Sequence, residues 1–109
     1  MAERGRPVKS QIRQNIIELL AVMKKSYGYT ISRAYMQVFP EVHTRSIYYH
    51  LKKGVEIGEI EVDEIREEKG EFSWGSKVEK TYYRVGKNAV VKGDERVKNY
   101  FESNKDSSK

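Results

Sequence analysis

Apolar residues recur with a helical period in the first part of the chain. Five of them fall on one face of a helix, at i, i+4, i+7, i+8 and i+11: Ile12, Ile16, Leu19, Leu20 and Met23. Pro7 or Ser10 is suited to begin this helix, and Tyr27-Gly28 is suited to end it, because glycine favours helix C-termini. The pattern therefore predicts a first helix between these limits.

Two shorter helical patterns follow. The second has apolar residues at i, i+3, i+4 and i+7: Ile31, Ala34, Tyr35 and Val38. We expect Thr30 to cap this helix and Pro40 to stop it, because proline disfavours helical geometry at the preceding residue. The third helix begins near Thr44, another expected cap, and runs to about Ile57, with this apolar face: Ile47, Tyr48, Leu51 and Val55. The short connection between these two helices is the spacing of a helix-turn-helix.

After Gly58 the apolar period becomes alternating. The alternating apolar residues Ile60 and Val62 predict a strand. Ile65 is one step out of phase with them, which predicts a bulge at Asp63-Glu64. Residues 67–77 are interpreted as a long hairpin loop and residues 78–85 as the return strand. The second half of the chain thus begins with a β-hairpin.

The order of the elements predicts the fold class. Asp94 is suited to cap a last helix with three apolar residues on one face: Val97, Tyr100 and Phe101. A helix-turn-helix followed by a β-hairpin is a winged helix, so we expect an α+β fold with a three-helix core, a two-stranded wing and a short C-terminal helix. The expected divisions are a flexible basic arm (1–9), a winged-helix domain (10–86), a linker with the short helix (87–102) and a disordered tail (103–109).

The composition narrows the function classes. The 109 residues contain no cysteine, which excludes disulfides and zinc-thiolate sites. The two histidines, His43 and His50, cannot complete a zinc site, and nucleotide-binding loops and nucleophile elbows are absent. No apolar run approaches the ~20 residues of a membrane span, and the N-terminus lacks a signal-peptide pattern. We expect a soluble, cytoplasmic protein that is not an enzyme and uses no cofactor or metal.

Positive charge is concentrated at the front of the chain. The net charge is +5, and residues 1–58 hold ten Lys or Arg against four Asp or Glu. Residues 59–86 reverse this balance, with five basic against eight acidic residues. This asymmetry indicates a polyanionic partner on one side only. The alternative is a solvated Lys/Glu-rich surface of the kind common in thermophile proteins.

Three segments resemble PadR-like transcription regulators. Tyr27-Gly28-Tyr29-Thr30-Ile31 is similar to that family's entry into its second helix. Ser46-Ile47-Tyr48 to Leu51, then Gly58-Glu59-Ile60, resembles its third helix and the exit into the wing. Lys80-Thr81-Tyr82-Tyr83-Arg84-Val85 is similar to its second wing strand. The resemblance spans about residues 10–86 and implies a winged-helix, DNA-binding repressor.

The chain departs from this family at two places. Gly54 stands where the family has an apolar residue, so either Val55 makes that core contact or the helix loosens there. The family generally dimerises through long C-terminal helices, whereas only Asp94 to about Ser103 is available here. The resemblance thus implies a homodimer, with its interface left open and any small-molecule effector unknown.

The third helix carries the main candidate DNA contacts. A helix-turn-helix lays its recognition helix in the major groove, with the N-terminal residues nearest the bases. The first turn and the face opposite the apolar one supply six candidates: Thr44, Arg45, Ser46, Tyr49, Lys52 and Lys53. Arg45 and Ser46 suit base contacts, because Arg pairs bidentately with guanine, and the lysines suit phosphates. The alternative is a solvated helix face, and His50 is interpreted as structural.

The N-terminus offers an independent signal. Arg4-Gly5-Arg6-Pro7 matches the core of AT-hook motifs, which lie extended in narrow minor grooves. We expect Arg4 and Arg6 to enter such a groove, and the alternative is a flexible terminus without this role. Lys9 and Arg13 would then contact phosphates.

The second helix and the wing add weaker candidates. Arg33, expected on an outer face with Ser32 and Gln37, suits a phosphate contact or a surface ion pair. The wing tip carries four residues suited to contact a phosphate or the minor groove: Lys69, Phe72, Trp74 and Lys77. The first wing strand is strongly acidic, so we expect it to face away from DNA. Trp74 suits packing over the sheet or on a partner.

These observations predict a sequence-specific, double-stranded DNA-binding transcription regulator, with residues 44–57 in the major groove. Two alternatives stay open. One is an RNA or single-strand binder that stacks bases on Tyr49, Phe72 and Trp74. The other is a winged-helix protein–protein adaptor that binds no nucleic acid.

Overall fold

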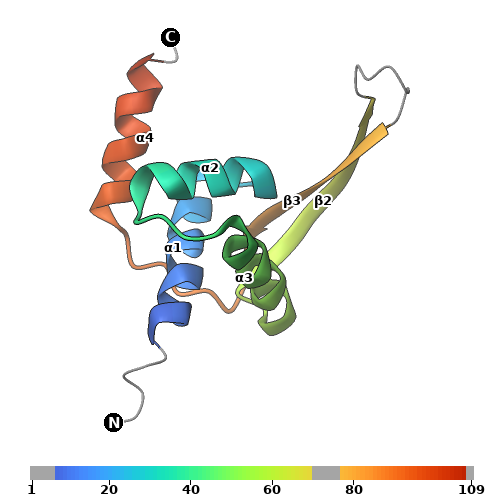
Figure 1. The fold of residues 1–109 in the computed structure, drawn as a ribbon, viewed down its shortest axis with the longest axis horizontal. Helices are drawn as coiled ribbons and strands as arrows, with labels where there is room; N and C mark the ends of the chain where they lie inside the picture. The colour runs from blue at the N-terminus through green and yellow to red at the C-terminus, as the bar shows by residue number, and fades with distance from the viewer. Residues whose placement is uncertain (1–6, 70–76, 108–109) are drawn as a thin grey trace.

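The computed structural model describes residues 7–69 and 77–107. Three helices precede a β-hairpin, and a fourth helix follows it (Figure 1). The elements are α1 (Pro7–Met23), β1 (Ser26–Tyr27), α2 (Gly28–Val38), α3 (Thr44–Ile57), β2 (Ile60–Lys69), β3 (Lys77–Val85) and α4 (Glu95–Ser107). The predicted α+β winged-helix class is confirmed, and α3 has the predicted limits.

The first helix starts at one of its two predicted residues, and the second and third helices differ from the prediction in the residue that caps them. α1 begins at Pro7, whose fixed φ suits the first helical position. α2 begins at Gly28 after an extended Tyr27, because the short strand β1 leads straight into the helix. Thr30 therefore lies inside the first turn, and Thr44 is likewise preceded by His43 as the N-terminal flanking residue of α3. The prediction that these threonines cap the helices is wrong.

The wing belongs to a three-stranded antiparallel sheet with the order β1-β3-β2. The predicted bulge is present, since the register of β2 against β3 shifts between Val62 and Glu64. Val62 then lies opposite Tyr83 and Ile65 opposite Thr81, so both apolar residues stay on one face of the sheet. The strands reach Lys69 and start at Lys77, which makes the hairpin longer than predicted.

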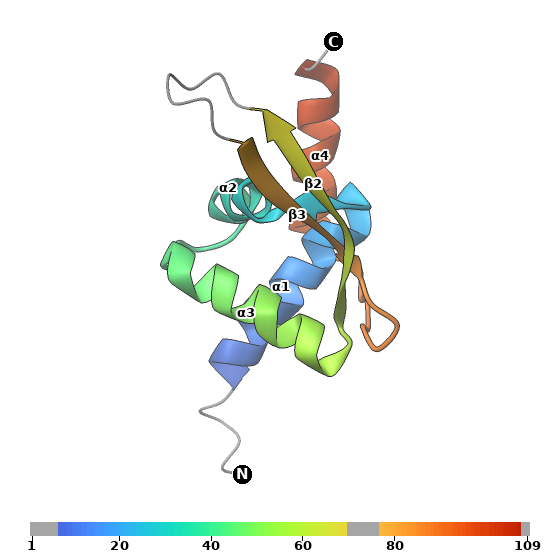
Figure 2. The same ribbon diagram turned by 90° about the vertical axis from the view of Figure 1, so that its right-hand side faces the viewer.

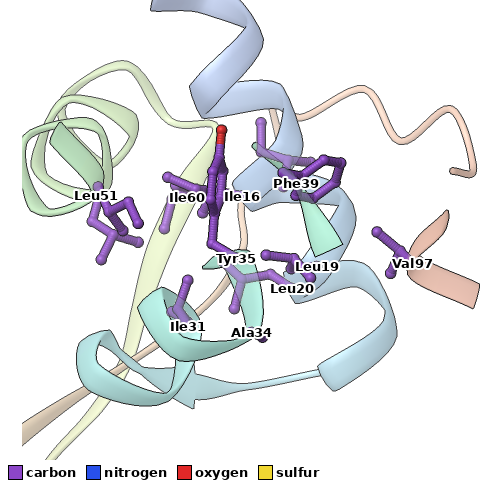
Figure 3. Packing of buried hydrophobic residues seen from close by; sticks show 12 residues of the cluster. Ile16, Leu19, Leu20, Ile31, Ala34, Tyr35, Phe39, Leu51, Ile60 and Val97 are labelled. Carbon is purple, nitrogen blue, oxygen red and sulfur yellow. The ribbon is translucent and has the colours of Figure 1, made fainter. Parts of the chain in front are cut away.

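The core lies where α1 crosses α2 and α3 and meets the base of the hairpin (Figures 2 and 3). Its fully buried aliphatic side chains come from five elements: Ile16, Ile17, Leu19, Leu20, Ile31, Ile47, Leu51, Ile60 and Val97. Tyr35 and Phe39 of the α2 region pack ring against ring, with centroids 5.1 Å apart. Burial of this cluster fixes the angle between α3 and the wing.

Gly54 sets how closely α3 approaches the first wing strand. A Cβ atom at this position would lie 2.6 Å from Cδ1 of the buried Ile60. Ile60 therefore fills the space that a side chain at Gly54 would need. Val55 is 37% exposed and does not make the core contact, and the helix continues without loosening to Ile57. Gly58, at φ 83°, then turns the chain into the wing.

The connection to α4 is held to α1 by a buried carboxylate. Glu18 accepts backbone N–H donors from Lys92 at 2.8 Å and Gly93 at 2.9 Å. Val97 then packs into the core, so the start of α4 belongs to the same body. α4 runs to Ser107, past the predicted end near residue 102, and projects beyond α2 (Figure 1). The predicted disordered tail is therefore helical as far as residue 107.

Candidate nucleic-acid interface

The outer face of α3 gathers most of the residues predicted to contact DNA. The helix buries Ile47, His50, Leu51 and Gly54 on its inner face. Its opposite face exposes four of the six candidates: Thr44, Arg45, Tyr49 and Lys52. Ser46 is half-buried, and its N–H donates to the His43 carbonyl at 2.9 Å. The amphipathic pattern of α3 thus places the polar candidates together because the apolar stripe is fixed in the core.

The cations on this face differ in what they bind within the chain. Arg45 and Lys52 have no carboxylate at ion-pair distance in the described part of the chain. Lys53 is 3.8 Å from Glu56, one turn later on the helix. Tyr49 is 54% exposed, and its ring packs edge-on against His50 with centroids 4.9 Å apart. This packing limits where the Tyr49 hydroxyl can point.

Arg13 is mostly buried and is paired with residues of the protein itself. Its Nε donates to Glu59 Oε1 at 2.9 Å, and its Nη1 lies 3.2 Å from Nδ1 of His50. The Arg13 side chain is only 18% exposed. This ion pair joins α1 to the start of the wing, so the role of Arg13 in this structure is to hold α1, α3 and the wing together. His50 is 3% exposed, as the structural interpretation of this residue requires.

The α2 candidates separate in the structure. Arg33 is exposed and its Nη1 donates to the Tyr29 hydroxyl at 3.1 Å. Gln37 is also exposed, whereas Ser32 is buried and was wrongly placed on the outer face. Arg33 therefore makes no surface ion pair within the described residues, and its partner is the hydroxyl of a tyrosine.

Several candidates for DNA contact lie outside the described residues or at their edges. Arg4 and Arg6 lie outside the described residues, as do Phe72 and Trp74 of the wing tip. Three lysines lie at the edges of the described segments, with only their backbone described: Lys9 in α1, Lys69 in β2 and Lys77 in β3. Their predicted DNA contacts stay predictions.

Three carboxylates of the acidic wing strand are paired with cations from β3, from β2 itself and from the segment after α1. Arg84 donates to Glu61 at 2.6 Å and to Asp63 at 2.9 Å. Lys25 lies 3.3 Å from Asp63 and 3.0 Å from Glu64. A further pair joins Arg66 to Glu64. Strand alternation places Glu61 and its partner Arg84 on the face opposite the buried Ile60, away from the helical core.

These contacts lower the affinity of the wing carboxylates for protons. The hydrogen bond from Arg84 lowers the pKa of Glu61 and of Asp63 below their ordinary values. The hydrogen bond from Lys25 does the same for the pKa of Glu64. Glu61, Asp63 and Glu64 are therefore compensated charges at neutral pH.

No protein-family model and no curated protein matches the sequence. Solved structures do. A PadR family transcription regulator from hypervirulent Clostridium difficile R20291 is 20% identical, with 88% of this chain and 84% of that chain covered and a TM-score of 0.51. A protein from Thermoplasma acidophilum, described as a transcriptional regulator, is 18% identical, with 94% and 88% covered and a TM-score of 0.53. The chain has the fold of PadR-like regulators.

The PadR-like fold also brings together four tyrosines from separate elements. Tyr27, Tyr29, Tyr48 and Tyr83 line a groove of about 300 Å³ between the start of α2, the side of α3 and β3. Burial and the neighbouring Tyr48 raise the pKa of Tyr83 above its ordinary value. The exposed aromatic residues of the Tyr-Gly-Tyr segment were the available signal in the sequence.

Residues 7–69 and 77–107 contain no group of three or more His, Asp or Glu placed to hold a metal ion. Within the same residues, no helix is long and apolar enough to cross a membrane.

Proposed function

We propose that the protein is a sequence-specific, double-stranded DNA-binding transcription regulator that acts as a repressor. One observation carries this proposal: the exposed face of α3 presents Arg45, Tyr49 and Lys52, and the two cations have no carboxylate partner in the described part of the chain. The similarity in fold to a PadR family transcription regulator supports it. A repressor of this kind would act by occupying DNA that the transcription machinery needs.

The proposed complex places α3 in the major groove. Arg45, in the first turn, is nearest the base edges and is suited to bidentate pairing with guanine. Lys52 lies two turns further on and neutralises a phosphate, while Tyr49 lies between them. The Arg4 and Arg6 arm would enter the adjacent minor groove, with Lys9 and Lys77 on flanking phosphates.

A homodimer completes the proposal. Two copies related by a two-fold axis would read half-sites about one helical turn, ~34 Å, apart. The projecting part of α4 is the proposed contact, with Tyr100 and Phe101 half-buried on its apolar side. Sedimentation equilibrium of the full chain tests this directly, and a monomeric mass at all concentrations and on DNA would contradict it.

The function is tested by binding to a random duplex library at several salt concentrations, with sequencing of the retained molecules. We expect a two-fold-related motif to be enriched. Arg45→Ala should then relax the preference at one base position, at a cost of about 1–3 kcal/mol. Lys52→Gln should weaken binding to all sequences and reduce the slope of log K against log salt by about 0.9.

The outcomes separate the alternatives. Tight binding without any enriched motif would contradict sequence-specific regulation. Preference for single strands over duplex would favour the RNA or single-strand binder, and absence of binding at moderate salt would favour the adaptor.

A further inference from the structure

The groove between α2, α3 and the wing has walls from three elements. Tyr27, Gly28 and Tyr29 come from the start of α2, Tyr48 from α3, and residues 79–81 with Tyr83 from β3. On the α3 side it is bounded by Tyr48, which directly precedes the exposed Tyr49 in the helix. Figure 1 shows α2 and α3 beside the hairpin. A ligand in this groove would therefore adjoin whatever α3 contacts.

Gly28 allows the groove to be narrow. A Cβ atom at Gly28 would lie 2.4 Å from Cε1 of Tyr48, so only glycine lets this ring lie against the start of α2. The contact fixes the ring of Tyr48, which is still 43% exposed. The Tyr48 hydroxyl has no hydrogen-bond partner among the described residues. A rigid hydroxyl thus remains available to an external acceptor.

Tyr29 presents a second hydroxyl, and its hydrogen-bond direction is determined by Arg33. Nη1 of Arg33 donates to the Tyr29 oxygen at 3.1 Å, and the guanidinium also lies 5.7 Å from the ring centre. Because the oxygen already accepts a hydrogen bond, the Tyr29 hydroxyl is left to act as a donor. No described residue accepts that hydrogen, and the side chain is 54% exposed. The neighbouring positive charge strengthens such a donor.

The charges around the groove favour an anion at one end. Arg33 lies behind Tyr29, and Nζ of Lys80 lies 4.6 Å from the centre of the Tyr27 ring. Glu79 is the carboxylate in the lining. It lies on β3 toward the wing tip, whereas Arg33 lies beside Tyr29 at the α2 end, so an anion is favoured at the α2 end of the groove.

We propose that this groove binds one phosphodiester of the DNA backbone, next to the bases contacted by α3. The Tyr29 and Tyr48 hydroxyls donate to the phosphate oxygens, and Arg33 supplies positive charge. The proposal rests on the proposed DNA-binding function, and it assigns the tyrosines a positioning role: they fix the register of α3 on the duplex.

The test measures duplex binding by Tyr29→Phe and Tyr48→Phe, which remove one oxygen and keep the ring. The probe is the duplex enriched from the library, and the control is Tyr82→Phe on β3, whose ring packs against Arg66 and does not line the groove. Each groove variant should lose about tenfold in affinity, as expected for a hydrogen bond to a charged group. The salt slope should be unchanged, because a neutral hydroxyl displaces no counterion, whereas Arg33→Gln should lower it by about 0.9.

A second measurement identifies the phosphate. Methylphosphonate groups, which lack the phosphate charge, are placed one at a time along the backbone. One position should weaken the wild type about tenfold and leave the Tyr29→Phe, Tyr48→Phe double variant almost unaffected. Equal affinities of the phenylalanine variants and the wild type would overturn the groove proposal alone, and loss on Tyr48→Ala but not Tyr48→Phe would indicate base stacking instead. If the wild type binds no duplex, the proposed function and the groove proposal both fail.

Discussion

Helix α3 carries four charged residues and the two wing strands carry eleven, and the two regions use their cations differently. On α3, Arg45 and Lys52 point to solvent without a carboxylate partner in the described part of the chain. On the wing, Arg84 is held by two carboxylates at 2.6 and 2.9 Å. The net charge of a region therefore does not show which of its cations are available to an anionic partner. What matters is whether each cation is already paired within the fold.

The difference arises from secondary structure. On the two-stranded wing, side chains of β2 and β3 lie directly opposite one another, so Glu61 meets Arg84 across the ladder. On α3, the available acidic residue is Glu56, and it lies one turn from Lys53, too far along the helix to reach Arg45. Pairing is therefore built into the wing and largely absent from the outer face of the helix.

The largest expected effect comes from removing two positive charges from one region or the other. One double variant, the α3 pair, combines Arg45→Gln with Lys52→Gln. The other, the wing pair, combines Arg84→Gln with Lys25→Gln, whose side chain pairs with Asp63 and Glu64 of the wing. Each double variant reduces the net charge from +5 to +3. The α3 pair should weaken DNA binding on the order of 100-fold, about 3 kcal/mol, because one base contact and one phosphate contact are lost. The wing pair should change affinity less than about threefold, because its cations are already compensated.

Titration of a labelled duplex at fixed salt measures both double variants side by side. Equal losses in the two variants would show that only total charge matters, and the contrast between helix and wing would then have no functional meaning.

A smaller effect is expected at the joint between the two regions. Gly54→Val should destabilise the fold by about 1–3 kcal/mol, because the new side chain overlaps Ile60 and forces α3 away from β2. Val55→Ala on the same turn is the control and should cost less, since Val55 is 37% exposed. Urea unfolding followed by circular dichroism measures both. A Gly54→Val protein as stable as the wild type would contradict the close packing of α3 on the wing.

The smallest effect is the response of the wing to acid. The pKa values of Glu61 and Asp63 are lowered in the fold, so the stability they contribute is present above their ordinary values of 4.5 and 3.8. This contribution is lost as the pH falls through the lowered values of the folded protein. The wild type should therefore lose stability below about pH 4.5, and Arg84→Gln should lose less. The difference is small because these groups are exposed and screened by salt.

Amide hydrogen exchange of β2 and β3 at pH 6 and at the acid end of this range, or urea unfolding at both, measures the response. An identical acid response in the wild type and Arg84→Gln would show that the cross-strand pairs do not stabilise the wing.

The local pattern of the sequence was sufficient for much of the fold. The spacing of Ile47 and Leu51 predicted α3 with its observed limits, because helical amphipathicity is a local property. The phase change before Ile65 predicted the bulge, because strand alternation has a period of two. The outer face of α3 followed from the same pattern, since the residues opposite a buried stripe must face solvent.

Contacts between distant segments required the tertiary structure. Arg13 looked like a phosphate ligand, and only the fold brings it to Glu59, 46 residues away. Glu18 meets the backbone of Lys92 and Gly93 across more than 70 residues, and no local pattern signals this bond.

The helices, the hairpin, the bulge and the exposed basic face of α3 could be predicted from the sequence, because each depends on a periodicity within one element. The tertiary structure alone decided which charges are paired, why Gly54 is glycine, and that Tyr29, Tyr48 and Tyr83 line one groove. These features depend on where separate elements meet, and packing of the whole core, rather than the spacing of residues along the chain, fixes that geometry.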